Sequence, residues 1–103
     1  MSEWIELVAL DQLTEGQGKS IKGPDGHVYA LFLHGGQVKA LDDECCHQGG
    51  PLGEGDLDGG GVVSCPWHGW QFNVDTGECL DIPGECVRAY PTRVENGKVQ
   101  VQV

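Results

Sequence analysis

The sequence predicts an all-β protein, built as an antiparallel sandwich or small barrel. About eight or nine short runs of apolar or alternating residues recur along its 103 residues, and turn residues separate them. The chain also contains 17 glycines, which suits a compact and turn-rich structure whose backbone comes close to a bound group. Almost no stretch has the spacing of a helix.

The first 41 residues predict four strands. The strongest is 27–34, in which successive apolar side chains alternate between two faces. The Gly35-Gly36 pair predicts a tight hairpin that leads into 37–41. Two further strands are expected at 4–9 and 18–22.

The remaining residues predict a connection followed by four more strands. The connection is 53–61, where glycines and acidic residues alternate without helical spacing. Pro91 lies inside an expected strand and places that strand at an edge or beside a bulge. Asn96-Gly97 predicts a two-residue hairpin turn. The expected strands are 62–64, 71–74, 87–94 and 98–103.

Composition restricts both the class and the location of the protein. The length suits one domain, 1–103, with a modest core. The 16 acidic and 6 basic residues give a net charge of −10, which disfavours nucleic acid as a partner. The N-terminus has no signal peptide, and no apolar run approaches the ~20 residues of a membrane helix. We therefore expect a cytoplasmic protein with no membrane partner, whose five cysteines are reduced.

Two short cysteine–histidine pairs are the candidate functional residues. They read Cys45-x-His47, then seventeen residues, then Cys65-x-x-His68, and glycine follows each pair. Thiolate and imidazole are ligands for zinc and for iron–sulfur clusters, and two loops can bring such ligands together. This spacing predicts a metal centre held by these four side chains.

The pattern resembles the Rieske [2Fe–2S] family. The resemblance includes the residues around each pair, at 48–52 and 67–72, and it extends over nearly the whole chain. It implies one [2Fe–2S] cluster per chain, with Cys45 and Cys65 on the inner iron and His47 and His68 on the outer, more exposed iron. It also implies a cluster-binding subdomain, about 42–84, inserted into the larger β core.

The function implied by the resemblance is electron transfer without substrate chemistry. The chain is similar to ferredoxin components of bacterial ring-hydroxylating dioxygenase systems. It would accept one electron from a flavin- or iron–sulfur-containing reductase and pass it to a terminal oxygenase. His47 or His68 would be the point from which the electron leaves. The protein is therefore expected to be a carrier and not an enzyme.

Two alternatives remain open from the residues. The first keeps the same cluster in a small subunit of a larger reductase, such as a nitrite reductase. The second is a structural zinc module that uses Cys45, His47, Cys65 and His68, because zinc accepts two thiolates and two imidazoles. Iron and sulfide content distinguishes the second alternative from the cluster.

The roles of three other cysteines and of one loop are less certain from the pattern than those of the two pairs. Cys46 adjoins His47 and competes with Cys45 as the ligand, although the spacing of the family favours Cys45. Cys79 and Cys86 could form a disulfide across a short loop, but free thiols are favoured in the cytoplasm. Ile82-Pro83-Gly84 is either a third loop that covers the cluster or an ordinary surface turn. His27 and His34 have no cysteine partner nearby and are interpreted as structural or surface residues.

Overall fold

The computed structural model describes residues 3–44, 51–67, 69–81, 84 and 86–103. These residues form ten strands and two short 3-10 helices. The strands are β1 (Trp4–Ala9), β2 (Gly18–Lys22), β3 (Val28–His34), β4 (Gln37–Asp42), β5 (Asp56–Leu57), β6 (Val62–Ser64), β7 (Gln71–Asn73), β8 (Ala89–Tyr90), β9 (Thr92–Glu95) and β10 (Lys98–Gln102). The helices are η1 (Leu10–Gln12) and η2 (Leu52–Glu54). In this part of the chain no helix is long and apolar enough to cross a membrane.

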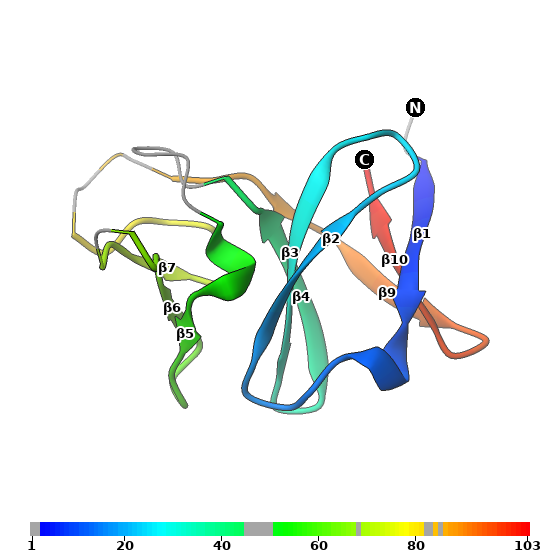
Figure 1. Ribbon diagram of the computed structural model, residues 1–103, viewed down its shortest axis with the longest axis horizontal. Helices are drawn as coiled ribbons and strands as arrows, with labels where there is room; N and C mark the ends of the chain where they lie inside the picture. Colours follow the sequence, from blue (N-terminus) through cyan, green and yellow to red (C-terminus); the bar gives the residue numbers. More distant parts are fainter. Residues whose placement is uncertain (1–2, 45–50, 68, 82–83, 85) are drawn as a thin grey trace.

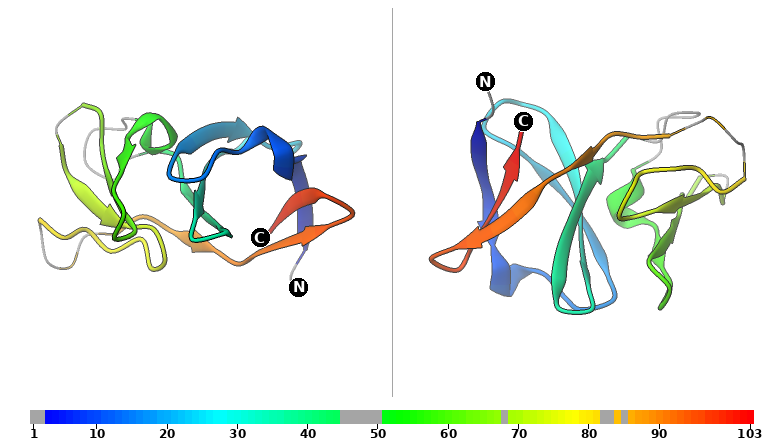
Figure 2. Two further views of the ribbon diagram at one scale, coloured as in Figure 1. Left: turned by 90° about the horizontal axis from the view of Figure 1, so that it is seen from below. Right: turned by 180° about the vertical axis from the view of Figure 1, so that it is seen from behind.

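Three antiparallel sheets make up the fold, which confirms the predicted class. A four-stranded sheet, β2-β3-β4-β8, lies between the sheet β1-β10-β9 and the small sheet β5-β6-β7. Figures 1 and 2 show the small sheet beside one face of the central sheet and the terminal strands at the other. The chain therefore separates into a larger β body and a smaller β unit that comes from the middle of the sequence.

Strand β3 is apolar on both faces because both faces are covered. Ala30 and Phe32 pack toward the small sheet, whereas Tyr29 and Leu31 pack toward the sheet of β1, β9 and β10. All four side chains are at most 1% exposed. The alternation predicted for 27–34 is thus confirmed, and a strand buried on both sides needs apolar residues at every position.

The terminal strands close the larger body. Residues Ile5 and Val101 are partners in the pairing of β1 with β10, and Val99 and Val101 are fully buried. The Asn96-Gly97 turn joins β9 to β10, and both residues have a positive φ, 52° and 75°. Two consecutive positive φ angles are those of a type I′ hairpin, so the predicted turn is confirmed.

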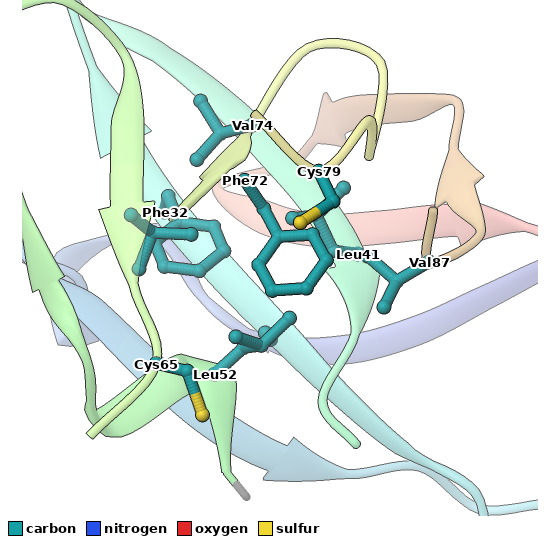
Figure 3. Close-up of a cluster of buried hydrophobic side chains, with 10 residues drawn as sticks. Phe32, Leu41, Leu52, Cys65, Phe72, Val74, Cys79 and Val87 are labelled. Atoms are coloured by element: carbon teal, nitrogen blue, oxygen red, sulfur yellow. The ribbon is translucent and has the colours of Figure 1, made fainter. Parts of the chain in front are cut away.

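A second buried cluster fills the space between the central sheet and the small sheet. Figure 3 shows Phe32 and Leu41 of the central sheet facing Phe72 of β7, with Leu52 below them. Phe72, Leu52 and Leu41 are 0% exposed. This packing fixes the small sheet on the larger body through apolar contact.

The prediction of a single strand over 87–94 is wrong in one respect. The chain forms β8 before Pro91 and β9 after it, and the two strands belong to different sheets. Residue Tyr90 pairs with Ala40 of β4, whereas Thr92 pairs with Val101 of β10. Because proline has no N–H to donate, the ladder stops there and the chain passes from one sheet to the other.

The prediction that 53–61 is only a connection is also incomplete. It contains part of η2 and the strand β5, whose residue Leu57 pairs with Val63 of β6. The turn between the strands is held by the Asp58 carboxylate, which accepts hydrogen bonds from the N–H groups of Gly60 and Val62 at 2.8 and 3.0 Å. A side chain bonded to its own turn supplies the order that glycine content alone does not indicate.

Candidate metal centre

Only one of the four predicted ligands lies among the described residues. Cys65 is described, whereas Cys45, His47 and His68 lie outside the described ranges, as does Cys46. The structure does, however, describe the residues that flank both pairs. The geometry of the site is therefore built from Cys65 and from these flanking residues.

Cys65 directly follows β6 and belongs to the cluster between the sheets. The residue is 3% exposed. Its N–H donates to the Trp70 carbonyl at 2.7 Å, and its own carbonyl accepts from the Gly69 N–H at 2.9 Å. Gly69 has a φ of +74°, which glycine adopts without strain. The two ends of the Cys65–Trp70 segment are thus held together, so the second pair lies on a short connection between β6 and β7.

The residues on either side of the first pair are also held together. Glu44 and Pro51 form an antiparallel bridge, and the Leu52 N–H donates to the Asp43 carbonyl at 2.7 Å. Leu52 and Cys65 belong to the same buried cluster, and Figure 3 shows them next to each other at its margin. The fold therefore brings the base of the first pair to Cys65 of the second.

A third segment is attached to the end of the second pair. The Gln71 N–H donates to the Asp81 carboxylate at 2.7 Å, and the Leu80 N–H donates to the Gln71 carbonyl at 2.8 Å. The Ile82-Pro83-Gly84 loop of the sequence follows at once. Whether this loop covers the cluster or is a surface turn stays a prediction, because Ile82 and Pro83 lie outside the described residues.

Cys79 and Cys86 are free thiols in different surroundings. Cys79 is 2% exposed and packs in the cluster of Figure 3, whereas Cys86 is exposed. Residue 86 is bridged to Glu78, the neighbour of Cys79. Because neighbouring residues of a strand point to opposite faces, the two sulfurs are directed apart.

The charge of the chain is divided unevenly, a feature that the motif analysis missed. Residues 40–87 contain ten Asp and Glu and no Lys or Arg, whereas the rest of the chain contains six of each. The segment that includes both ligand pairs thus carries the whole net charge of −10. A count of charges along the sequence, region by region, is the signal that would have found it.

A polar and aromatic cluster lies at the start of β3 and the end of β4. Asp42 accepts hydrogen bonds from the Tyr90 hydroxyl at 2.6 Å and lies 2.6 Å from the Nε2 atom of His27. The Tyr29 hydroxyl donates to the Asp25 carboxylate at 2.9 Å. His27, which was predicted to be a structural or surface residue, lies half-exposed in this cluster.

The tyrosines of this cluster predict loss of stability at high pH. Burial, and then the hydrogen bond to Asp25, raise the pKa of Tyr29 to about 12, and burial with the bond to Asp42 also raises the pKa of Tyr90. In the unfolded chain a tyrosine has a pKa near 10, so the stabilising contribution is complete below pH ~10 and is lost as the pH rises toward 12. For Tyr29 the loss is about 2–3 kcal/mol.

Urea unfolding at several pH values between 8 and 12 measures this effect. We expect Tyr29→Phe to weaken the decline of stability above pH 10, and Tyr29→Phe combined with Tyr90→Phe to weaken it further. An unchanged slope in the double variant would show that other groups cause the alkaline unfolding.

Comparison with known proteins identifies chains that this one matches over most of their length. The family model for the Rieske [2Fe-2S] domain matches residues 3–91. The ferredoxin component of the p-cumate 2,3-dioxygenase system of Pseudomonas putida is 36% identical over 105 residues, which cover 100% of this chain and 88% of that protein.

Solved structures give the same result for the fold. A complex of reduced oxygenase and oxidized ferredoxin in carbazole 1,9a-dioxygenase contains a chain with 31% identity and a TM-score of 0.84; the match covers 95% of this chain and 91% of that one. A chain from Mycobacterium tuberculosis, assigned as an NADH-dependent nitrite reductase small subunit, has 33% identity and a TM-score of 0.88. That match covers 100% of this chain and 96% of the other.

Proposed function

Because this chain belongs to the Rieske [2Fe-2S] domain family, we propose that it carries single electrons from a reductase to a terminal oxygenase. The observation that carries this proposal is the full-length similarity to ferredoxin components of dioxygenase systems. The protein has a Rieske-type [2Fe–2S] cluster and is an electron carrier, not an enzyme. When bound, the cluster supplies a site that gains and loses one electron, at a higher potential than an all-cysteine site.

We assign the cluster ligands as Cys45, His47, Cys65 and His68. The two thiolates would hold one iron and the two imidazoles the other. The buried thiol of Cys65 fits this role, and the bridge between Glu44 and Pro51 holds the base of the first pair within the same part of the fold. We further infer that 1–103 is a single domain, of which about 42–84 is the cluster-binding subdomain.

The side chains around the second pair would control access to the site. Trp70 is partly buried against the cluster of apolar residues, whereas Trp67 is 58% exposed. An aromatic ring packed beside a metal centre excludes water from it. Trp67 instead offers apolar area on the surface, next to His68 in the sequence, where a partner protein would make contact.

The partners follow from the relatives and from the charge. The carbazole 1,9a-dioxygenase structure contains an oxygenase together with its ferredoxin, and a reductase must supply the electron. The net charge of −10 in residues 40–87 would steer a positively charged partner toward this part of the chain. The contact would be small and transient, as contacts between redox partners generally are. We place these encounters in the cytoplasm, where free thiols such as Cys79 and Cys86 persist.

A second candidate function is supported by the match to a nitrite reductase small subunit. In that case the chain would be a stable subunit of a larger reductase and not a diffusing carrier. Affinity purification of the tagged chain from its native cell distinguishes the two. A stoichiometric complex that survives gel filtration indicates the subunit, whereas a free chain indicates the carrier.

The cofactor and its redox behaviour are tested on the purified protein. We expect a red-brown protein with two irons and two sulfides per chain, and a Rieske-type EPR signal after reduction by dithionite. The reduced protein should then give its electron to a purified Rieske-type terminal oxygenase. A colourless chain with one zinc after anaerobic preparation would overturn the proposal and favour the structural zinc module.

A further inference from the structure

Asp43 is the only charged side chain that is buried in the described part of the chain. It is 8% exposed, directly follows β4 and lies two residues before Cys45. Burying a carboxylate is costly unless hydrogen bonds compensate it. At the base of the first ligand pair, the Asp43 carboxylate therefore needs hydrogen-bond donors.

The carboxylate connects three separate segments through one oxygen atom. Its Oδ1 accepts a hydrogen bond from the Ser20 hydroxyl of β2 at 2.6 Å and another from the Gly53 N–H of η2 at 2.8 Å. Its backbone carbonyl accepts from the Leu52 N–H at 2.7 Å. Only glycine allows this close approach at position 53, because the Cβ of any other residue would lie 2.6 Å from the Ser20 nitrogen. Asp43 thus joins both sides of the first pair to the larger body.

The negative charge of Asp43 has no cationic partner among the described residues. None of the ion pairs there includes it, and residues 40–87 contain no Lys or Arg. A buried charge is screened less by solvent and salt than an exposed one. Its field therefore acts on whatever redox group the neighbouring pair holds, and it opposes the addition of an electron.

We propose that Asp43 is a positioning residue for the metal centre, which holds the base of the first ligand pair and lowers the reduction potential of the centre through its charge. This inference rests on the proposed function, because it requires a redox centre at Cys45 and His47. Both hydrogen bonds that described residues donate to the side chain end on Oδ1, so an asparagine oxygen can accept both. Asp43→Asn consequently removes the charge and keeps the contacts.

The first experiment compares Asp43→Asn with Glu44→Gln in redox titrations of the cluster-loaded protein at one pH. Glu44 is the exposed neighbour of Asp43, so the control removes the same charge one residue closer to Cys45. We expect Asp43→Asn to favour the reduced form on the order of tenfold, or about 59 mV for one electron. Glu44→Gln should have less than half of this effect. Equal shifts, or no shift in Asp43→Asn, would overturn the role of the buried charge.

A second variant tests the same charge by removing a hydrogen-bond donor to it. The Ser20 hydroxyl directs the positive end of its dipole at the carboxylate, so Ser20→Ala leaves the charge less compensated. We expect its potential to move down, opposite to Asp43→Asn, whereas simple loosening of the fold would move both variants in one direction. Shifts of the same sign would therefore contradict the proposal. If Asp43→Asn does not fold, an upward shift or no shift in Ser20→Ala alone would contradict it.

Hydrogen exchange tests the positioning role without any electron transfer. Asp43→Ala removes the oxygen that accepts both hydrogen bonds, and we expect faster exchange in a peptide covering 51–57, which contains the Gly53 N–H. Asp43→Asn should leave this exchange near that of the unmodified protein. Unchanged exchange in Asp43→Ala would overturn the positioning role. A wild-type chain without iron and sulfide would instead refute the proposed function, so the two failures are distinguishable.

Discussion

Replacement of Cys45 by serine is expected to give a colourless protein, whereas Cys46→Ser should keep its cluster and colour. The two cysteines are adjacent, and neighbouring side chains of an extended segment point in opposite directions, so both thiols cannot easily reach one iron. The Cys-x-His spacing of the family assigns the ligand to Cys45. Loss of a thiolate leaves the cluster with three ligands, and because metal binding is coupled to folding the domain should also lose stability.

Iron and sulfide assays, together with the visible spectrum of each purified variant, measure this result. Cys65→Ser is the matched positive case, since Cys65 belongs to the buried cluster next to the first pair and should be equally indispensable as a ligand. Cys79→Ser is the matched negative case, because this buried thiol lies outside both pairs. A colourless Cys46→Ser protein with a coloured Cys45→Ser protein would reverse the assignment.

The second large effect is expected from Phe72→Ala. Phe72 is 0% exposed in the middle of β7 and packs in the cluster between the central and small sheets (Figure 3). Its backbone also pairs with Val63 of β6, the strand that leads to the second ligand pair, and forms an isolated bridge with Cys79. Removing the ring should cost about 3–5 kcal/mol, a large share of the ~5–15 kcal/mol that stabilises a small domain.

Urea denaturation measured by circular dichroism checks this prediction, and retention of iron during mild heating gives a second readout. Val94→Ala is the control, because Val94 is 43% exposed on β9, in the sheet on the far side of the molecule, and should change stability by less than ~0.5 kcal/mol. Phe72→Leu should fall between the two. Equal stability of Phe72→Ala and Val94→Ala would show that this packing does not hold the small sheet.

The sequence was sufficient for the features that depend on local pattern. The alternation in 27–34, the Asn96-Gly97 turn and the fold class are confirmed, because strand periodicity and turn conformation are set within a few residues. The resemblance to the Rieske family rested on two short pairs and their spacing, and the comparisons bear it out. The assignment of the individual ligands stays a prediction.

The sequence was not sufficient where an element depends on distant partners. Nothing local indicated that Asp56–Leu57 would form a strand, because its partner in β6 and the Asp58 turn supply the order. Likewise, Pro91 was expected to disturb one strand, but the choice of two different sheets depends on β4 and β10, about fifty residues before it and ten after it.

By itself the sequence determined the candidate chemistry of this protein: which side chains could hold a cluster, and that it would lie in an acidic all-β chain. Only the tertiary structure decided which groups surround that site. It joined Asp43 to Ser20 across 23 residues and brought Asp42 to Tyr90 across 48. The physical reason is that ligand type and strand periodicity are properties of short segments, whereas burial and hydrogen-bond partners arise only when distant segments pack together.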